Sequence, residues 1–292
     1  MDTMFLVRTL VGMAVFAIAA PILGCLIDGF DRIISARMQG RVGPKLLQPY
    51  WDVRKLLGKD RVSVSGSEDT YLNLSLFFAI LAGGMFFSGG NFLLVIFIIT
   101  LSSLFFIVAA YSTRSPYAEV GASRETLQVM AYDPMILFMA VAFYQVVGTF
   151  DVSGVFLLSH PAICAAWGVF LGLLFVLTIK LRKSPFDISS SHHAHQEIVK
   201  GITTEMSGSS LAKVEIMHWC ETVLFMGWVG VFFVYANPIS IVIALAVVLV
   251  VYLLEIWIDN NFARVKWQAM LKWAWLVALV TGTVNVAFLA FV

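Results

Sequence analysis

Long apolar stretches alternate with short polar segments along the whole chain. An α-helix needs about 20 consecutive apolar residues to cross a hydrocarbon layer of about 30 Å. Eight stretches are long enough: 5–27, 71–88, 92–112, 127–150, 162–181, 214–236, 239–257 and 269–291. We therefore predict an all-α fold, a polytopic membrane protein with about eight transmembrane helices in a single integral membrane domain, 1–292.

The composition agrees with this interpretation. Of the 292 residues, 60% are hydrophobic and 13% are charged, whereas soluble domains have roughly 45–50% apolar and 25% charged residues. The core of a soluble domain of this length could not bury so much apolar surface, so lipid must solvate most of it. The composition excludes a soluble domain and gives no sign of nucleic-acid binding.

The basic residues predict the orientation. If consecutive helices cross in alternate directions, four polar segments share one side: 28–70, 113–126, 182–213 and 258–268. With Lys180 and Lys272 reaching that interface from helix ends, this side holds 18 of the 19 Lys and Arg residues, and Arg8 is the exception. The positive-inside rule makes it cytoplasmic. We expect a multi-pass protein of the cell (cytoplasmic) membrane with its N- and C-termini outside.

Cysteine usage predicts no metal or disulfide chemistry. Cys25, Cys164 and Cys220 stand alone inside apolar stretches, and no Cys-x-x-Cys pair occurs. Structural zinc and iron–sulfur sites need clustered thiolates. The residues before Cys25 resemble a lipoprotein cleavage box, but apolar sequence continues beyond it, which favours a helix residue. We expect no cofactor bound by this chain.

The first cytoplasmic segment combines polar residues with a rigid turn. Arg37, Gln39 and Arg41 precede Gly43-Pro44, and residues 50–57 form a short amphipathic stretch. A helix resting on lipid headgroups explains the basic residues of that stretch. It explains the density of polar residues before the turn less well, so we favour a docking surface for a soluble partner.

Ionisable residues continue into the predicted spans. Asp133 lies about two turns inside the fourth span, where a carboxylate costs roughly 2.5–3.5 kcal/mol. An acid that still reaches water, because Pro134 opens the backbone, is the alternative. In the sixth span Glu215, His218 and Glu221 recur every three residues. Three titratable groups on one broad helix face usually mark an ion path or proton relay.

The third cytoplasmic segment contains three histidines within four residues, His192, His193 and His195. The spacing permits joint metal binding on a helix, but no thiolate or second histidine cluster completes a tetrahedral site. We therefore favour a hydrogen-bonding or proton-handling role over a metal site.

These segments together resemble the eight-helix membrane subunit that forms the quinone chamber of respiratory complex I, and its relatives in energy-converting, membrane-bound nickel–iron hydrogenases. The matching residues are Arg37-Met38-Gln39, Arg41, Gly43 and Pro44; Gln48-Pro49, Asp52 and Lys55-Leu56; Tyr117, Gly121, Arg124, Gln128 and Tyr132-Asp133; Pro185-Phe186-Asp187; Glu197, Gly201, Glu205 and Ser207-Gly208; Arg264, Lys266 and Gln268. They follow the family's order and cover nearly the whole chain.

Departures from the complex I pattern favour the hydrogenase branch. After Pro185-Phe186-Asp187, serines and histidines replace an acid-rich run, and His218 takes the place of an expected helix acid. Trp267-Gln268 replaces an Asp-Gln pair. The 115–117 and 191–197 segments are more similar to the ferredoxin-linked, Ech-type hydrogenases.

The resemblance implies a membrane-anchoring and coupling subunit, without a redox centre, in a ferredoxin-dependent hydrogenase complex that translocates H⁺ or Na⁺. Expected partners are a nickel–iron large subunit, an iron–sulfur small subunit, a ferredoxin-like subunit, an antiporter-like membrane subunit and the lipid bilayer. The nickel–iron centre and the iron–sulfur clusters would belong to those partners.

The resemblance also assigns roles to residues. Asp187, Glu197 and Glu205 would lie at the junction with the soluble arm, and Asp133, Glu215, His218 and Glu221 would continue the ion path inward. Arg114 and Arg124 are candidates for pairing with these acids. The expected arm-docking residues are Arg37, Gln39, Arg41, Asp52, Lys55, Arg114, Arg124, Arg264 and Lys266.

Other functions remain open at the sequence level. The alternative is a quinone-binding membrane subunit of a complex I-type NADH dehydrogenase, or a subunit of formate hydrogenlyase. A secondary transporter is less favoured, because the two halves show no convincing repeat. A passive membrane anchor with no ion path is also less favoured, because it does not explain the acidic residues of the sixth span.

Overall fold

The computed structural model describes residues 3–60, 66–186 and 198–291. Within them the regular elements are helices, with one isolated bridge between Asn91 and Asp151. The elements are α1 (Thr3–Met38), α2 (Gln48–Leu57), α3 (Gly66–Phe87), α4 (Phe92–Ser112), α5 (Pro116–Val147), η1 (Val152–Leu157), η2 (Ala162–Cys164), α6 (Trp167–Lys180), η3 (Ile198–Thr203), α7 (Ser209–Val231), α8 (Ile239–Asn261), α9 (Trp267–Val277), η4 (Ala278–Gly282) and α10 (Thr283–Phe291).

The predicted all-α membrane fold is confirmed. Among the described residues, six helices are long and apolar enough to cross a membrane: α1, α3, α4, α5, α8 and the continuous run from α9 to α10. The other two predicted spans coincide with α6, which has 14 residues, and with α7, whose 23 residues include the polar triplet of the sixth span. Each of the eight apolar stretches therefore corresponds to a helix or helix run.

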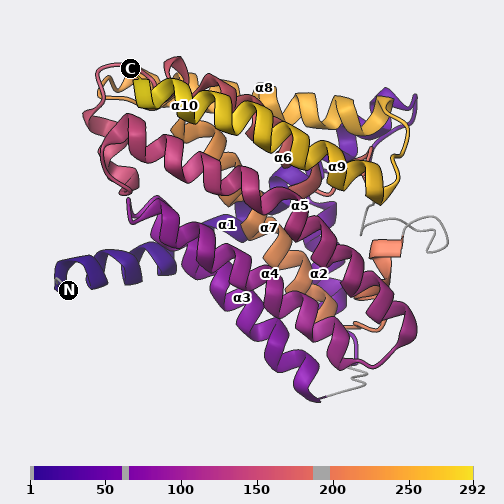
Figure 1. Cartoon of the computed structure of the whole chain (residues 1–292). Coiled ribbons are helices and arrows are strands. Elements are labelled where there is room, and N and C mark those ends of the chain that lie inside the picture. The colour runs from indigo at the N-terminus through magenta and orange to yellow at the C-terminus, as the bar shows by residue number, and fades with distance from the viewer. Residues whose placement is uncertain (1–2, 61–65, 187–197, 292) are drawn as a thin grey trace.

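The helices form one bundle in which α7 packs against α1, α2, α3 and α8, while α5 packs against α4, α6, α9 and η3. Figure 1 shows both ends of the chain at the same end of this bundle, with α2 toward the opposite end. The arrangement fits an even number of crossings. Which end faces the cytoplasm stays a prediction from the charge distribution.

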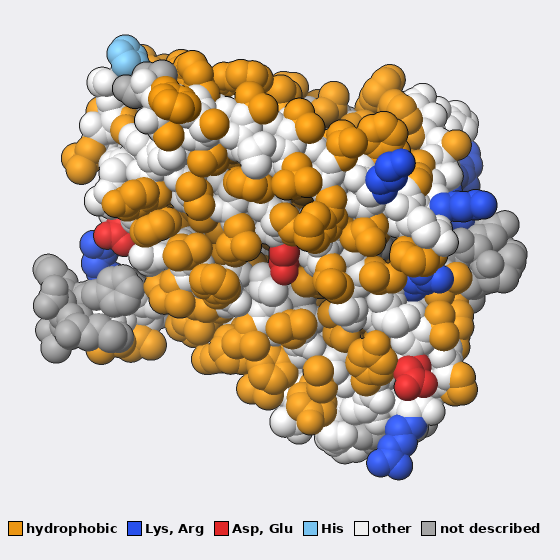
Figure 2. All heavy atoms as spheres, in the orientation of Figure 1, with side chains coloured by type: hydrophobic (Ala, Val, Ile, Leu, Met, Phe, Trp, Pro, Cys, Tyr) orange, Lys and Arg blue, Asp and Glu red, His pale blue; other side chains and the backbone are white. Residues whose placement is uncertain are grey.

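The bundle's surface has the character of a lipid-facing one. Large apolar side chains such as Ile18, Val242 and Leu245 are more than 60% exposed. Figure 2 shows apolar side chains covering the middle of one face, with most of its visible Lys and Arg gathered toward one end. Lipid is the solvent that such a surface needs, and the protein is therefore a multi-pass membrane protein.

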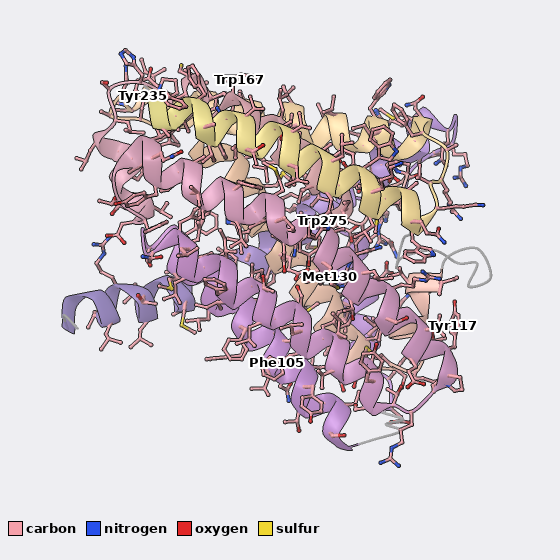
Figure 3. All side chains as sticks on the ribbon, in the orientation of Figure 1. Phe105, Tyr117, Met130, Trp167, Tyr235 and Trp275 are labelled. Atoms are coloured by element: carbon pink, nitrogen blue, oxygen red, sulfur yellow. The ribbon has the colours of Figure 1, made fainter. Side chains whose placement is uncertain are left out.

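Aromatic residues occur near both ends and along the C-terminal helices. In Figure 3, Tyr235 and Trp167 lie at one end of the bundle and Tyr117 lies at the other. Tyrosine and tryptophan favour the two membrane–water interfaces. Midway, the indole Nε1 of Trp275 donates to the backbone carbonyl of Met130 at 3.1 Å, which ties α9 to α5.

Three helices extend farther into the charged side than the sequence predicts. α1 continues to Met38, α5 begins at Pro116 and α8 ends at Asn261. Residues 28–38 are therefore helical, and the predicted span 5–27 is too short. Hydropathy alone misses these turns because they contain charged residues, some of which, such as Asp31 and Glu125, form ion pairs inside the protein.

Candidate functional site

A polar cavity of about 670 Å³ opens among α1, α2, α7, α8, η3 and the residues that follow α6. Of the 24 residues that line it, 13 are ionisable. The ionisable side chains that line it are Asp28, Asp31, Arg32, Asp52, Lys180, Arg182, Lys183, Lys200, Glu215, His218, Glu221, Tyr252 and Asp259. So many charges around one cavity between apolar helices are costly unless they neutralise one another.

α7 contributes the polar triplet that the sequence singled out. Glu215, His218 and Glu221 all line the cavity, as their three-residue spacing along one helix face requires. Glu221 is the deepest of the three and is buried, with 6% of its surface exposed. The prediction that these groups share a face is confirmed by their common cavity.

Arg182 joins three elements at the wall of this cavity. Its Nη2 donates to Oε1 of Glu125 on α5 at 3.3 Å, and its Nη1 contacts the imidazole of His218 on α7. A guanidinium group can only donate. In this contact the ring of His218 can therefore only accept.

Lys180 points into the protein. Its Nζ lies 3.7 Å from the ring centroid of Tyr132 and 5.0 Å from that of Phe225, both of which are buried. Its ammonium group also interacts electrostatically with the carboxylates of Glu221 and Asp133. The expectation that Lys180 reaches the membrane interface is therefore wrong, because aromatic faces and interior carboxylates attract its charge more strongly.

A second ion cluster connects α1, α8 and the chain after α6. The ammonium of Lys183 contacts the carboxylate of Asp31 and lies 3.4 Å from that of Asp259. The hydroxyl of Tyr252 donates to Asp31 at 3.3 Å. Burial alone would lower the pKa of Lys183, but the two carboxylates outweigh it and raise this pKa above its usual 10.5. Lys183 therefore stays charged at neutral pH.

A third cluster fixes the amphipathic helix α2 against α1. Arg32 pairs with Asp28 at 3.0 Å, one turn earlier on α1, and with Asp52 on α2 at 2.8 Å. The indole Nε1 of Trp219 on α7 donates to Asp28 at 3.4 Å. These contacts hold α2 across the mouth of the cavity instead of leaving it free on the headgroups.

Comparisons with known proteins support one family. The sequence profile described as NADH dehydrogenase matches residues 10–290. The chain belongs to the NADH dehydrogenase family. The sequence-based resemblance to this family is thereby confirmed, and the polar cavity described above is the interior of one of its members.

Relatives in this family cover nearly the whole chain. Formate hydrogenlyase subunit 4 of Escherichia coli is 27% identical over 96% of this chain and 95% of its own length. Hydrogenase-4 component C of the same organism is 26% identical over 90% and 92%. A subunit of the NADH-quinone oxidoreductase of Geobacillus thermodenitrificans is 25% identical over 89% and 86%. All three are components of oxidoreductase complexes by name.

The fold of this NADH dehydrogenase family member also occurs in a solved respiratory complex. A chain of the archaeal membrane-bound sulfane sulfur reductase matches with a TM-score of 0.83. The match covers 95% of this chain and 99% of the other, at 22% identity. The comparison shows that the two chains share a fold.

The expected arm-docking residues mostly lie on the surface. Arg37, Gln39, Arg41, Lys55, Arg114, Arg264 and Lys266 are exposed. Asp52 is half-buried in its ion pair with Arg32, and the guanidinium of Arg124 lies 4.5 Å from the ring centroid of Trp267. The cation beside Glu125 is Arg182 from the segment after α6, and not the expected Arg114, which precedes α5, or Arg124, which lies on α5.

The expected ion-path residues divide into three groups. Glu215, His218 and Glu221 come together at the cavity. Asp133 is half-buried and interacts electrostatically with Lys180. Glu205 is half-buried between η3 and α7 and does not line the cavity. Asp187, Glu197, His192, His193 and His195 lie outside the described residues. Among the described residues, no group of His, Cys, Asp and Glu has the arrangement of a metal site.

Sequence reasoning missed nine of the thirteen ionisable residues that line the cavity, namely Asp28, Asp31, Arg32, Lys180, Arg182, Lys183, Lys200, Tyr252 and Asp259. One signal was present. Asp28, Asp31 and Ser35 follow the apolar stretch at i, i+3 and i+7 spacing. This spacing is expected when the helix continues beyond the apolar stretch and places these polar residues on one face. The partners of these acids come from distant segments, which no local pattern reveals.

Proposed function

We propose that this chain is the membrane-anchoring and coupling subunit of an energy-converting oxidoreductase complex, and specifically of a ferredoxin-dependent, ion-translocating nickel–iron hydrogenase. One observation carries the coupling role: the connected charges of Glu125, Arg182, His218, Lys180 and Glu221 between the polar cavity and the buried centre of the bundle. The hydrogenase branch is supported by the sequence departures and by the similarity to two subunits of hydrogen-forming complexes by name.

The physical basis of coupling is the low dielectric around these charges. In water, two unit charges 4 Å apart interact by about 1 kcal/mol, and by about 4 kcal/mol at an effective dielectric constant of 20. A proton gained or lost at the cavity therefore changes the charge state favoured by the next group inward. If a redox-driven change in the soluble arm altered the charge at the cavity, it would change the protonation of the connected groups between the cavity and the centre of the bundle.

Exposed basic residues on the predicted cytoplasmic side would anchor the soluble arm. Arg37, Lys55 and Lys266 are exposed. A soluble arm with acidic groups in its contact surface would dock here by charge complementarity. By this proposal the electrons stay in the partners, namely the nickel–iron large subunit, the iron–sulfur small subunit and the ferredoxin-like subunit. An antiporter-like membrane subunit would receive the ion movement.

A quinone-binding subunit of a complex I-type NADH dehydrogenase is the second candidate. It is supported by the similarity to the Geobacillus NADH-quinone oxidoreductase subunit. Thirteen of the 24 residues that line the cavity are ionisable, which favours an ion path over a site for an apolar isoprenoid tail. Formate hydrogenlyase differs from the first proposal only in the electron donor, and its subunit 4 supports it equally.

Isolation of the intact complex distinguishes these functions. The tagged chain is purified from native membranes in a mild detergent, and its partners are identified by mass spectrometry. The complex is then assayed for hydrogen formation with reduced ferredoxin, for hydrogen formation with formate and for quinone reduction with NADH. We expect a nickel–iron large subunit and ferredoxin-dependent hydrogen formation. Quinone reduction by NADH without a nickel–iron subunit would contradict the proposal.

A further inference from the structure

A long apolar groove runs along the N-terminal half of α1, apart from the polar cavity. Its volume is about 530 Å³, and its other wall is made by Phe87 and Val223. Val7, Val11, Val15, Ala19 and Leu23 line it at four-residue steps. Sixteen residues of helix extend over about 24 Å, so the groove is long, narrow and parallel to the helix axis.

The groove is open toward the surrounding membrane. Val7, Val11 and Val15 are each between 57% and 60% exposed, although they line it. Apolar side chains that are exposed within a membrane face lipid tails. A single long acyl chain has the length and the apolar character that this groove offers.

One end of the groove carries a positive charge. Nη2 of Arg8 donates to the backbone carbonyl of Ser88 at 2.8 Å, which fixes the guanidinium beside the turn between α3 and α4. No carboxylate of the described residues pairs with Arg8. Arg8 is also the one basic residue that the charge distribution assigns to the outer side.

The opposite end of the groove is closed. Leu23 and Val223 are its last residues, and the next residue of α1, Gly24, packs directly on Trp219. A Cβ atom at Gly24 would overlap with Trp219. The polar cavity begins beyond this contact, at Gly24 and Ile27. A molecule in the groove therefore has its polar end at Arg8 and not in the cavity.

We propose that this groove seats one acyl chain of an anionic phospholipid whose phosphate group binds Arg8. The apolar stripe solvates the chain, and the fixed guanidinium supplies the charge that a phosphate complements. The lipid would fill the groove beside the contacts that α1 makes with α3 and α7. This proposal is independent of the hydrogenase assignment, since it concerns the opposite end of the bundle.

The test measures lipid binding to the intact complex, isolated in detergent, by native mass spectrometry. Phosphatidylglycerol, phosphatidylcholine and a menaquinone are added as separate probes. Arg8→Gln removes the charge, and Lys272→Gln is its control because Lys272 is exposed on α9 outside the groove. Val15→Trp fills the groove, and Val242→Trp is its control because Val242 is 67% exposed on α8. Val11→Phe is a second filling variant.

We expect Arg8→Gln to weaken phosphatidylglycerol binding by about fivefold and to remove the preference over phosphatidylcholine. Val15→Trp and Val11→Phe should each lose one bound phospholipid per complex, whereas both controls retain it. Equal lipid retention in all variants would overturn the proposal. So would preferential binding of the menaquinone, or cross-linking of a Val11→Cys variant to a neighbouring subunit, which would place a protein helix in the groove.

Discussion

Nη2 of Arg182 lies 3.3 Å from Oε1 of Glu125, and this pair joins the loop after α6 to the interior face of α5. Only 13% and 7% of the two side chains are exposed. Because the second oxygen of Glu125 has no hydrogen-bond partner among the described residues, Arg182 is the main compensation for its charge. The same guanidinium contacts His218, so Arg182 connects the acid of one helix to the titratable face of another.

Replacing Arg182 by Gln should destabilise the complex by about 3–5 kcal/mol, because it leaves the Glu125 carboxylate buried and uncompensated. Apparent thermal unfolding of the purified complex measures this loss. The double variant Glu125→Gln with Arg182→Gln should recover most of the stability, since it removes both charges. A double variant as unstable as the single one would show that the ion pair is not the cause.

Lys183 gives a pH-dependent prediction. Its folded-state pKa is raised above 10.5 by Asp31 and Asp259 despite burial. A raised folded-state pKa contributes stability that is complete below the unfolded-state pKa and is lost as pH rises through the folded-state pKa. The stability difference between wild type and Lys183→Met should therefore be constant between about pH 6 and 9. It should shrink only above about pH 10.5, and a decline near neutral pH would contradict the assignment.

Gly121 allows α5 to approach η3 closely. A Cβ atom at this position would overlap with the backbone of Gly201 and Ile202. Gly121→Ala should cost about 1–3 kcal/mol through overpacking and displace η3 from the cavity wall. Gly230→Ala on α7 is the control, because its Cβ would lie an ordinary 3.6 Å from Val248. Thermal unfolding of both variants should show a loss for Gly121→Ala and no loss for Gly230→Ala.

The docking surface gives a salt-dependent prediction. Reversing two exposed charges, Arg37→Glu with Lys266→Glu, should weaken retention of the soluble arm several-fold and lower the salt concentration at which it dissociates, because exposed charges are screened within about 8 Å at physiological salt. Co-purification of arm subunits over a salt series measures this. The exposed charge of Lys272 lies outside the proposed surface, so Lys272→Glu should retain the arm as wild type does.

The sequence predicted the fold well because apolar runs report directly on lipid burial. It also predicted Glu215, His218 and Glu221 as one functional face, since three residues on one helix need no tertiary information. It misjudged Lys180, whose position at a helix end is compatible with either the interface or the interior. Only the approach of Tyr132 and Phe225 from other helices decides between them. Arg182 and Lys183 could not be assigned either, because their partners lie on α5, α1 and α8.

By the proposed function, the interior charges couple redox turnover to ion movement. The most direct test is the ion gradient formed per electron transferred in proteoliposomes that contain the whole complex. Glu221→Gln and Lys180→Met are compared with the exposed-site controls Glu119→Gln and Lys272→Met. We expect the gradient per electron to fall roughly tenfold or more in the first two variants, with electron transfer maintained and both controls at the wild-type level. A full gradient in Glu221→Gln and Lys180→Met would show that these interior charges do not couple electron transfer to ion movement.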